Sequence, residues 1–210
     1  AVLGLRSYVF VPADIEPAKI RQAVAFGAHL VPVDGTYDEI NRLSIEVADE
    51  LGWAFVNVNL RPYYSEGSKT LAYEVAEGLG WRLPDVVVVP VASGSLFTKV
   101  AKGFGELVRY GLVEPRDVRY VGAQPAGCAP VAAGYASDGE RPIPVRDPRT
   151  IVRSLAIGSP ADGTYAIRLA RESGGSIEAV SDEATVSAIR WTAGEEGIFT
   201  TRIAYAQEMR

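Results

Sequence analysis

Four consecutive valines, Val86 to Val89, constrain the fold of this chain more than any other feature. A β-branched run without alternating polar residues predicts a strand that is buried on both faces of its sheet. Strands of this kind are typical of parallel sheets, which helices cover on both sides. The run therefore predicts an α/β protein in which this strand lies at the centre of a parallel sheet.

The hydrophobic pattern before this run alternates between strands and helices. Thr36 and Glu39 form a capping-box pattern at the start of one expected helix, and Gly52 is a suitable residue to end it. The order favours a parallel sheet with covering helices. The expected elements are a strand over residues 7–11, a helix from Pro17, a strand over 30–33, a helix with Ile40, Leu43, Val47 and Leu51 on its buried face, and a strand over 53–58.

The polar, proline-containing connection at residues 59–65 is the best candidate for a domain boundary. We therefore predict a small α/β domain over residues 1–58 and a larger one over 59–210. The overall expectation is an α/β fold of three layers, with parallel sheets and helices on both faces. Beyond the boundary we expect strands over 85–91 and 118–121, helices over 95–110, 128–135, 162–172 and 182–195, and a helix over 66–80 that buries Leu71, Val75 and Leu79.

Composition excludes several classes of protein. The chain has 210 residues, a formal net charge of −5 and a single cysteine, Cys128, which therefore has no disulfide partner within the chain. Cys128 and the single histidine, His29, cannot build a zinc site by themselves, and we expect both to be packed or surface residues without a catalytic role. The acidic balance disfavours nucleic-acid binding, and no apolar stretch is long enough to span a membrane. We expect a cytoplasmic protein.

The segment after the valine run has the composition of a phosphate-binding loop. Small residues lead from the expected strand into a helix at Ala92, Ser93, Gly94, Ser95 and Leu96. Such a loop presents backbone N–H groups at the positive end of a helix dipole, and small side chains let an anion approach them. A tight turn with a serine cap is the alternative. A second stretch, Gly67 to Thr70, resembles the end of a P-loop, but it lacks the required glycine spacing and the preceding strand.

Several ordered motifs give this chain a resemblance to threonine synthase, a pyridoxal-phosphate (PLP) enzyme of the tryptophan-synthase-β-like superfamily, fold type II. They occur at residues 4–20, 59–99, 122–130, 150–163 and 196–199, and they include RPYYSEGSKT, SLAIGSPADG and EGIF. The resemblance implies a two-domain α/β enzyme that converts O-phosphohomoserine and water to threonine and phosphate. It also implies PLP as an electron sink held on a lysine, and it matches Ala92 to Leu96 to the pocket for the cofactor phosphate.

The chain departs from this family at both ends. The S-F-K-D-R-like segment with the Schiff-base lysine is absent, and none of the four lysines, Lys19, Lys69, Lys99 and Lys102, has its context. The G-N-T-like loop and the later Ser or Thr that faces the pyridine nitrogen are also missing. We therefore assign no catalytic residue and expect an incomplete fold type II enzyme that is inactive alone. Because these segments are missing, the sequence argues against retention of PLP by this chain.

Two alternatives remain open from the sequence. The chain could be a truncated, non-catalytic paralogue that binds a phosphorylated small molecule or serves only as an oligomerising protein. Another fold type II lyase, such as a threonine dehydratase, is disfavoured by the RPYYSEGSKT and SLAIGSPADG runs. In either case we expect a homo-oligomer, because the missing elements would otherwise leave an apolar face exposed.

Overall fold

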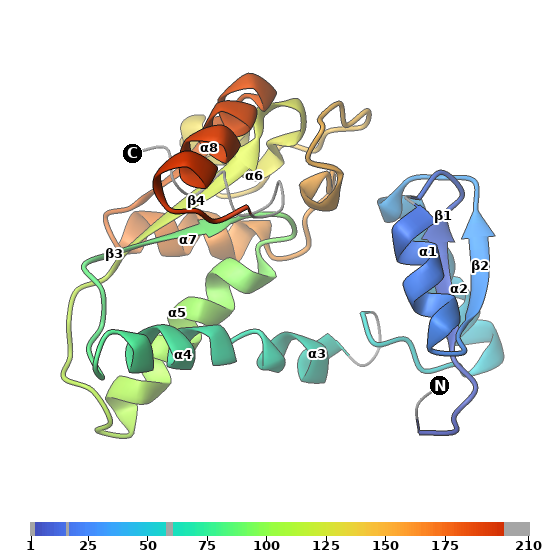
Figure 1. Cartoon of the computed structure of the whole chain (residues 1–210), viewed down its shortest axis with the longest axis horizontal. Coiled ribbons are helices and arrows are strands. Elements are labelled where there is room, and N and C mark those ends of the chain that lie inside the picture. The colour runs from blue at the N-terminus through green and yellow to red at the C-terminus, as the bar shows by residue number, and fades with distance from the viewer. Residues whose placement is uncertain (1–2, 16, 58–60, 200–210) are drawn as a thin grey trace. The chain divides into compact units, whose positions relative to one another are not determined.

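The computed structural model describes residues 3–15, 17–57 and 61–199. It divides into two compact units, Ala1–Tyr64 (unit 1) and Ser65–Arg210 (unit 2). The elements of each unit are labelled in Figure 1. Each unit is described by itself below.

Unit 1 holds a two-stranded parallel sheet in its described part. Strand β1 (Tyr8–Pro12) pairs with β2 (His29–Val33), and helix α1 (Pro17–Ala25) connects them. Helix α2 (Tyr37–Leu51) begins with the predicted capping box, in which the Thr36 hydroxyl accepts a hydrogen bond from the N–H of Glu39 and the Glu39 carboxylate accepts one from the N–H of Thr36. Gly52 ends the helix in the left-handed conformation, as predicted.

Two expectations for unit 1 are wrong. The segment from Trp53 to Asn57 forms no strand, and Val58 lies outside the described residues. Aromatic packing holds this segment instead, because the rings of Tyr8 and Trp53 lie 4.8 Å apart and those of Phe10 and Phe55 lie 5.3 Å apart. Leu51 was also wrongly placed on the buried face of α2, since it is exposed. Ile40 is buried and Leu43 and Val47 are partly buried, as predicted, and Ser44 and Ala48 are buried beside them.

Unit 2 contains a parallel sheet of three described strands in the order β3-β4-β5. They are β3 (Val86–Pro90), β4 (Arg119–Pro125) and β5 (Ser176–Val180). The valine strand is therefore not at the centre of this sheet, and Val86 is 38% exposed. The central strand is β4, where the consecutive residues Ala123 and Gln124 are buried. Because neighbouring side chains point to opposite faces, both faces are covered there. The α/β class with parallel sheets is confirmed.

The helices of unit 2 follow the predicted order (Figure 1). The helix expected over 66–80 is divided in two by Ser68 and Lys69. Strand β5 was missed because its short sequence, SIEAV, contains a glutamate and only two β-branched residues. The helices are α3 (Arg61–Gly67), α4 (Thr70–Gly78), α5 (Ser95–Arg109), α6 (Pro130–Ala136), α7 (Gly163–Glu172) and α8 (Asp182–Glu195), with short 3₁₀ turns at Ala126–Cys128 and Arg153–Leu155.

The contact between α4 and α5 uses small residues rather than the predicted leucines. Ala72 and Ala76 are fully buried, whereas Leu71 and Leu79 are 43% and 40% exposed. A Cβ atom on Gly103 would lie 2.7 Å from both the Cβ of Ala72 and the carbonyl oxygen of Lys69. The two helices approach too closely for larger side chains, which explains why the hydrophobic pattern indicated the wrong face.

This contact generates a prediction for two glycines of the same helix. Gly103→Ala should lower the free energy of unfolding by about 1–3 kcal/mol, because the added methyl group overpacks the crossing. Gly105→Ala should raise it by about 0.5–1 kcal/mol, because no atom lies within 4 Å of its Cβ position and alanine is the better helix former. Urea unfolding of both variants measures the difference, and equal effects would show that the crossing tolerates a wider separation.

Candidate functional site

The predicted phosphate loop lies at the carboxyl end of β3 and leads directly into α5. β3 ends at Pro90, and the 15-residue α5 begins at Ser95. The loop starts from a fixed position, because the N–H of Val91 donates to the carbonyl of Ala123 on the central strand over 2.8 Å. In parallel α/β sheets this edge is where ligands usually bind. No side-chain hydrogen bond caps α5 at Gly94, so the first turn keeps backbone donors for another acceptor.

Gly94 is held against the start of α7 by a close backbone approach. Its φ is 94°, and a Cβ atom placed on it would lie 2.8 Å from the carbonyl oxygen of Asp162. The N–H of Asp162 in turn donates to the carbonyl of Ser93 over 2.9 Å. Only glycine fits both the left-handed conformation and the short distance. The loop is therefore fixed by the backbone of a segment that lies almost 70 residues later in the chain.

Ser95 carries a buried hydroxyl for which the described structure contains no hydrogen-bond partner. Leaving a buried donor unpaired costs about 1–3 kcal/mol, so a bound acceptor would relieve an existing cost. The neighbouring Ser93 differs, because its hydroxyl accepts a hydrogen bond from the N–H of Ser95 over 3.3 Å. Among the predicted site residues, Ser95 thus carries a buried hydroxyl with neither a donor nor an acceptor among the described residues, directly at the start of α5.

The remaining predicted residues shape the loop. Ala92 and Leu96 are both partly buried, and they flank the serines and Gly94. Two residues of the site were not predicted from the sequence. They are Thr98, whose hydroxyl donates to the carbonyls of Gly94 and Ser95 over 3.1 and 3.0 Å, and Asp162. The position of Asp162 within the SPADG motif was the available signal, but nothing in its spacing indicated contact with Gly94.

Gln124 is a second fully buried group near the end of a strand. Its Oε1 atom accepts hydrogen bonds from the N–H groups of Val131 and Ala132, over 2.9 and 3.0 Å, and so caps the start of α6. Its Nε2 atom has no partner in the described part of the chain. The sequence motif that contains Gln124 is thereby explained as a helix cap at the carboxyl end of the central strand.

Lys69, Lys99 and Lys102 form ion pairs with Glu66 and Glu106. The Nζ atom of Lys69 lies 2.8 Å from Glu106 and 2.9 Å from Glu66, and Lys102 and Lys99 lie 2.6 and 3.3 Å from Glu66. The hydrogen bonds to Glu106 and Glu66 raise the pKa of Lys69 above its ordinary value of 10.5. A nucleophilic lysine must lose its proton and therefore needs a lowered pKa. This environment of Lys69 has the opposite effect.

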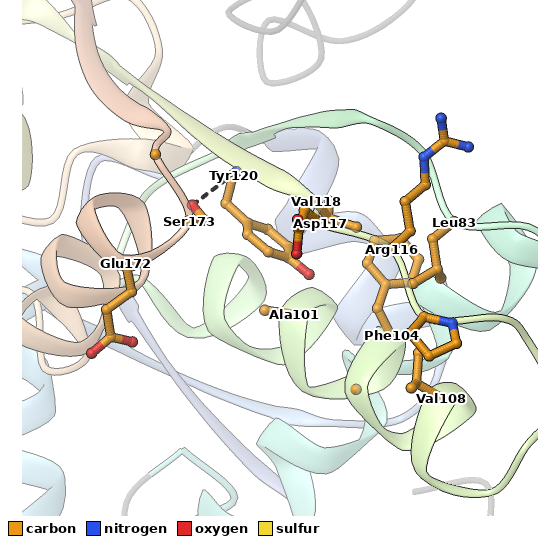
Figure 2. Close-up of a pocket in the computed structure, with 13 residues that line it drawn as sticks. Leu83, Ala101, Phe104, Val108, Arg116, Asp117, Val118, Tyr120, Glu172 and Ser173 are labelled. Atoms are coloured by element: carbon orange, nitrogen blue, oxygen red, sulfur yellow. Dashed lines mark hydrogen bonds between the residues drawn. The ribbon is translucent and has the colours of Figure 1, made fainter.

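The described structure also contains a pocket at the opposite edge of the sheet, close to the amino end of β4 (Figure 2). Tyr120 lies among the apolar side chains of this pocket, and burial raises its pKa to about 12. The phenol therefore stays neutral at physiological pH. Ser173 is engaged with the backbone, since its hydroxyl accepts from the N–H of Tyr120 over 3.1 Å. The pocket offers no activated group, so the loop at the carboxyl edge is the stronger candidate.

Metal sites and membrane spans are both absent from the part of the chain that the structure describes. Its residues include no group of three or more His, Cys, Asp or Glu side chains that could hold a metal ion. None of the described helices combines the length and apolar character needed to cross a bilayer.

Comparison with known proteins extends the resemblance found in the sequence. Threonine synthases from Bacillus sp. (strain ULM1) and Mycobacterium bovis are 33% and 34% identical to this chain over 201 and 197 residues. The matches cover 95% and 93% of this chain but 53% and 52% of the relatives. The chain thus spans about half the length of the curated relatives it matches.

Solved structures identify the fold. The serine racemase of maize matches 98% of this chain with a TM-score of 0.72 and 20% identity, and 60% of its own length is covered. A pyridoxal 5′-phosphate-dependent aspartate racemase matches 98% of this chain with a TM-score of 0.71 and 16% identity, and 59% of its length is covered. The predicted fold type II architecture is confirmed. A family model described as pyridoxal-phosphate dependent enzyme matches residues 1–206, and the chain belongs to that family.

Proposed function

We propose that this chain is part of a threonine-synthase-like enzyme, and that Ala92 to Leu96 bind the phosphate group of PLP. The observation that carries the proposal is the buried, unpartnered hydroxyl of Ser95 at the uncapped start of α5. A phosphate oxygen is an acceptor that suits this donor, and the positive end of the helix dipole favours its negative charge. The identity of the curated relatives supports the same assignment.

The residues of the loop suit a phosphate group in their chemistry. Gly94 lets the loop pack closely against the backbone of Asp162, and the hydroxyl of Ser95 can donate to a phosphate oxygen at the start of α5. Asp162 and Thr98 hold the loop through its carbonyl groups rather than through its N–H groups. When bound, PLP supplies an electron sink for carbanion chemistry, and the role of this chain is to bind and orient it.

We further propose that the chain does not itself provide the lysine to which PLP is attached. Lys69, Lys99 and Lys102 are paired with carboxylates, and none of the four lysines lies in the expected sequence context. The reaction of the relatives, conversion of O-phosphohomoserine and water to threonine and phosphate, would then require an amine from elsewhere. Nothing in the comparisons favours a non-catalytic paralogue.

We also propose the assignment of the units and the state of assembly. Unit 1 would correspond to the small domain and unit 2 to the large domain, with the boundary after Tyr64 rather than after residue 58. Trp81, Tyr110 and Leu112 of unit 2 are all more than half exposed, which supports a homo-oligomer. The resemblance to threonine synthase suggests a biosynthetic enzyme of the cytoplasm. Sedimentation of the chain at several concentrations would test the oligomer.

Gly94→Ala should weaken binding of inorganic phosphate by at least about tenfold, because the methyl group would collide with the carbonyl of Asp162 and displace the loop. Gly111→Ala is the matched control. It has a similar left-handed φ of 68°, but no atom lies within 4 Å of its Cβ position. Both variants should lose stability from backbone strain, and only Gly94→Ala should lose phosphate affinity in calorimetric titration. Equal affinities would place the phosphate elsewhere.

Ser95→Ala should raise the free energy of unfolding without ligand by about 1 kcal/mol, because it removes an unsatisfied buried donor. The same change should weaken phosphate binding by about tenfold. Ser181 is the control, because its hydroxyl caps the start of α8 by accepting a hydrogen bond from the N–H of Ala184. Ser181→Ala should therefore lower the free energy of unfolding by about 1 kcal/mol and leave phosphate binding unchanged. A loss of stability in both variants would show that Ser95 has a partner.

Treatment of the chain with PLP and borohydride should leave no stoichiometric covalent adduct at Lys69, Lys99 or Lys102, because their ammonium groups are held by Glu66 and Glu106. Peptide mass spectrometry locates any adduct, and urea-unfolded chain serves as the control in which all amines are free. Complete modification of one of these three lysines in the folded chain would contradict the proposal.

A further inference from the structure

The ion pairs between α3, α4 and α5 form a closed ring. The ring consists of Glu66, Lys69, Glu106 and Lys102, and we call it the charge ring. Lys69 contacts both glutamates, and Lys102 closes the ring with distances of 2.6 Å to Glu66 and 3.9 Å to Glu106. Tyr73 adds a hydrogen bond of 2.6 Å to Glu106 from the next turn of α4. Such a network fixes geometry better than an isolated surface pair.

The charge ring lies around the point where α5 crosses α4. That point is Gly103, which is buried against Ala72 and the backbone of Lys69. Lys102 immediately precedes Gly103 on α5, and Glu106 follows it by three residues. A glycine–alanine contact has no long side chains that interlock, so it sets the separation of the helices but resists rocking weakly. The ion pairs on either side of Gly103 add to the resistance to rocking that α5 gains from packing Phe97 and Phe104 on the sheet.

Rocking about Gly103 would move the phosphate loop. Gly94 precedes Gly103 by nine residues, which is about 14 Å along a helix axis. A rotation of about 5° would therefore displace the start of α5 by about 1 Å, which is larger than the range of acceptable hydrogen-bond lengths. Asp162 holds the loop on one side through Ser93, and the charge ring is the anchor on the α4 side.

The two glutamates of the ring remain ionised at physiological pH. Hydrogen bonds from Lys102 and Lys69 lower the pKa of Glu66 from 4.5 to about 2, and those from Lys69 and Tyr73 lower the pKa of Glu106. Its four members are 21–44% exposed, so we expect it to act by fixing distances rather than by deep burial of charge.

We propose that Glu66 and Glu106 are positioning residues, which set the crossing angle of α5 through Lys69 and Lys102 and thereby place the phosphate loop. The inference rests on the proposed function of that loop. It also gives the SEGSKT motif a role, since this motif contributes Glu66 and Lys69 to the charge ring. Lys69, which lies in the stretch that resembled the end of a P-loop, is thus a member of an ion-pair network rather than of an anion site.

Glu66→Gln separates positioning from a simple charge effect, because the two predict opposite changes in the affinity for inorganic phosphate. Removal of a negative charge near the loop would by itself strengthen binding of an anion. Loss of position should instead weaken binding of inorganic phosphate by about fivefold in the folded chain. Calorimetric titration of the full chain gives the affinity, and circular dichroism with thermal unfolding confirms that the variant is folded at the titration temperature.

Glu74→Gln is the matched control, because Glu74 is an exposed carboxylate of α4 that is not a member of the ring. The affinity of Glu74→Gln for inorganic phosphate should equal that of the unaltered chain or exceed it slightly. Glu106→Gln opens the ring from α5 and should weaken binding in the same way, so it decides the question if Glu66→Gln does not fold.

Each result of this experiment has a defined meaning. Weaker binding in Glu66→Gln or Glu106→Gln, with unchanged binding in Glu74→Gln, supports positioning. Affinities in the ring variants that match or exceed the control overturn it, even if the melting temperature falls, because a purely structural ring would affect only stability. Absence of phosphate binding by the unaltered chain would instead overturn the proposed function of the loop.

Discussion

The packing of α5 between the sheet and α4 is the constraint on which the rest of unit 2 depends. Phe97 and Phe104, both fully buried, project from this helix toward Tyr120 of the central strand, while Gly103 meets Ala72 on α4. Large side chains therefore face the sheet and small ones face the neighbouring helix. This division helps to fix the position of the start of α5, where the buried hydroxyl of Ser95 is an unused hydrogen-bond donor.

The hydrogen bonding at the start of α5 is less complete than at most buried polar side chains of the described residues. The hydroxyl of Ser44 shows the ordinary arrangement, because it is buried and donates to the carbonyl of Ile40 over 2.8 Å. The hydroxyl of Ser95 is also buried, but the described residues offer it no partner. The backbone of Asp162 leaves room only for glycine at position 94, and glycine has no side chain with which to cap the start of α5. Stability is thus lower at this loop for the same physical reasons that suit it to an anion.

Local patterns predicted most elements, because they depend on neighbouring residues alone. The capping box at Thr36, the end of α2 at Gly52 and the helix after the valine run all follow from such patterns. Errors arose where a distant segment decides the outcome. A run of valines does not reveal whether a strand is central or at an edge, and leucine spacing on α4 does not reveal that Gly103 draws α5 against the alanines. The loop residues were predicted, but the contact with Asp162 depends on tertiary packing.

The contacts of the lysines, rather than their number in the sequence, indicate what they do in this structure. The chain has four lysines in 210 residues, and in a family that binds an aldehyde cofactor on an amine none of the four lies in the sequence context expected of the attachment site. Three of them instead meet Glu66 and Glu106, and the resulting network lies beside the small-residue crossing of α4 and α5. A lysine that fixes a helix by its charge must stay protonated, whereas one that attacks a carbonyl must not. Because its pKa is raised by Glu106 and Glu66, Lys69 loses its proton less readily than an ordinary lysine, and its ion pairs oppose a role as a nucleophile.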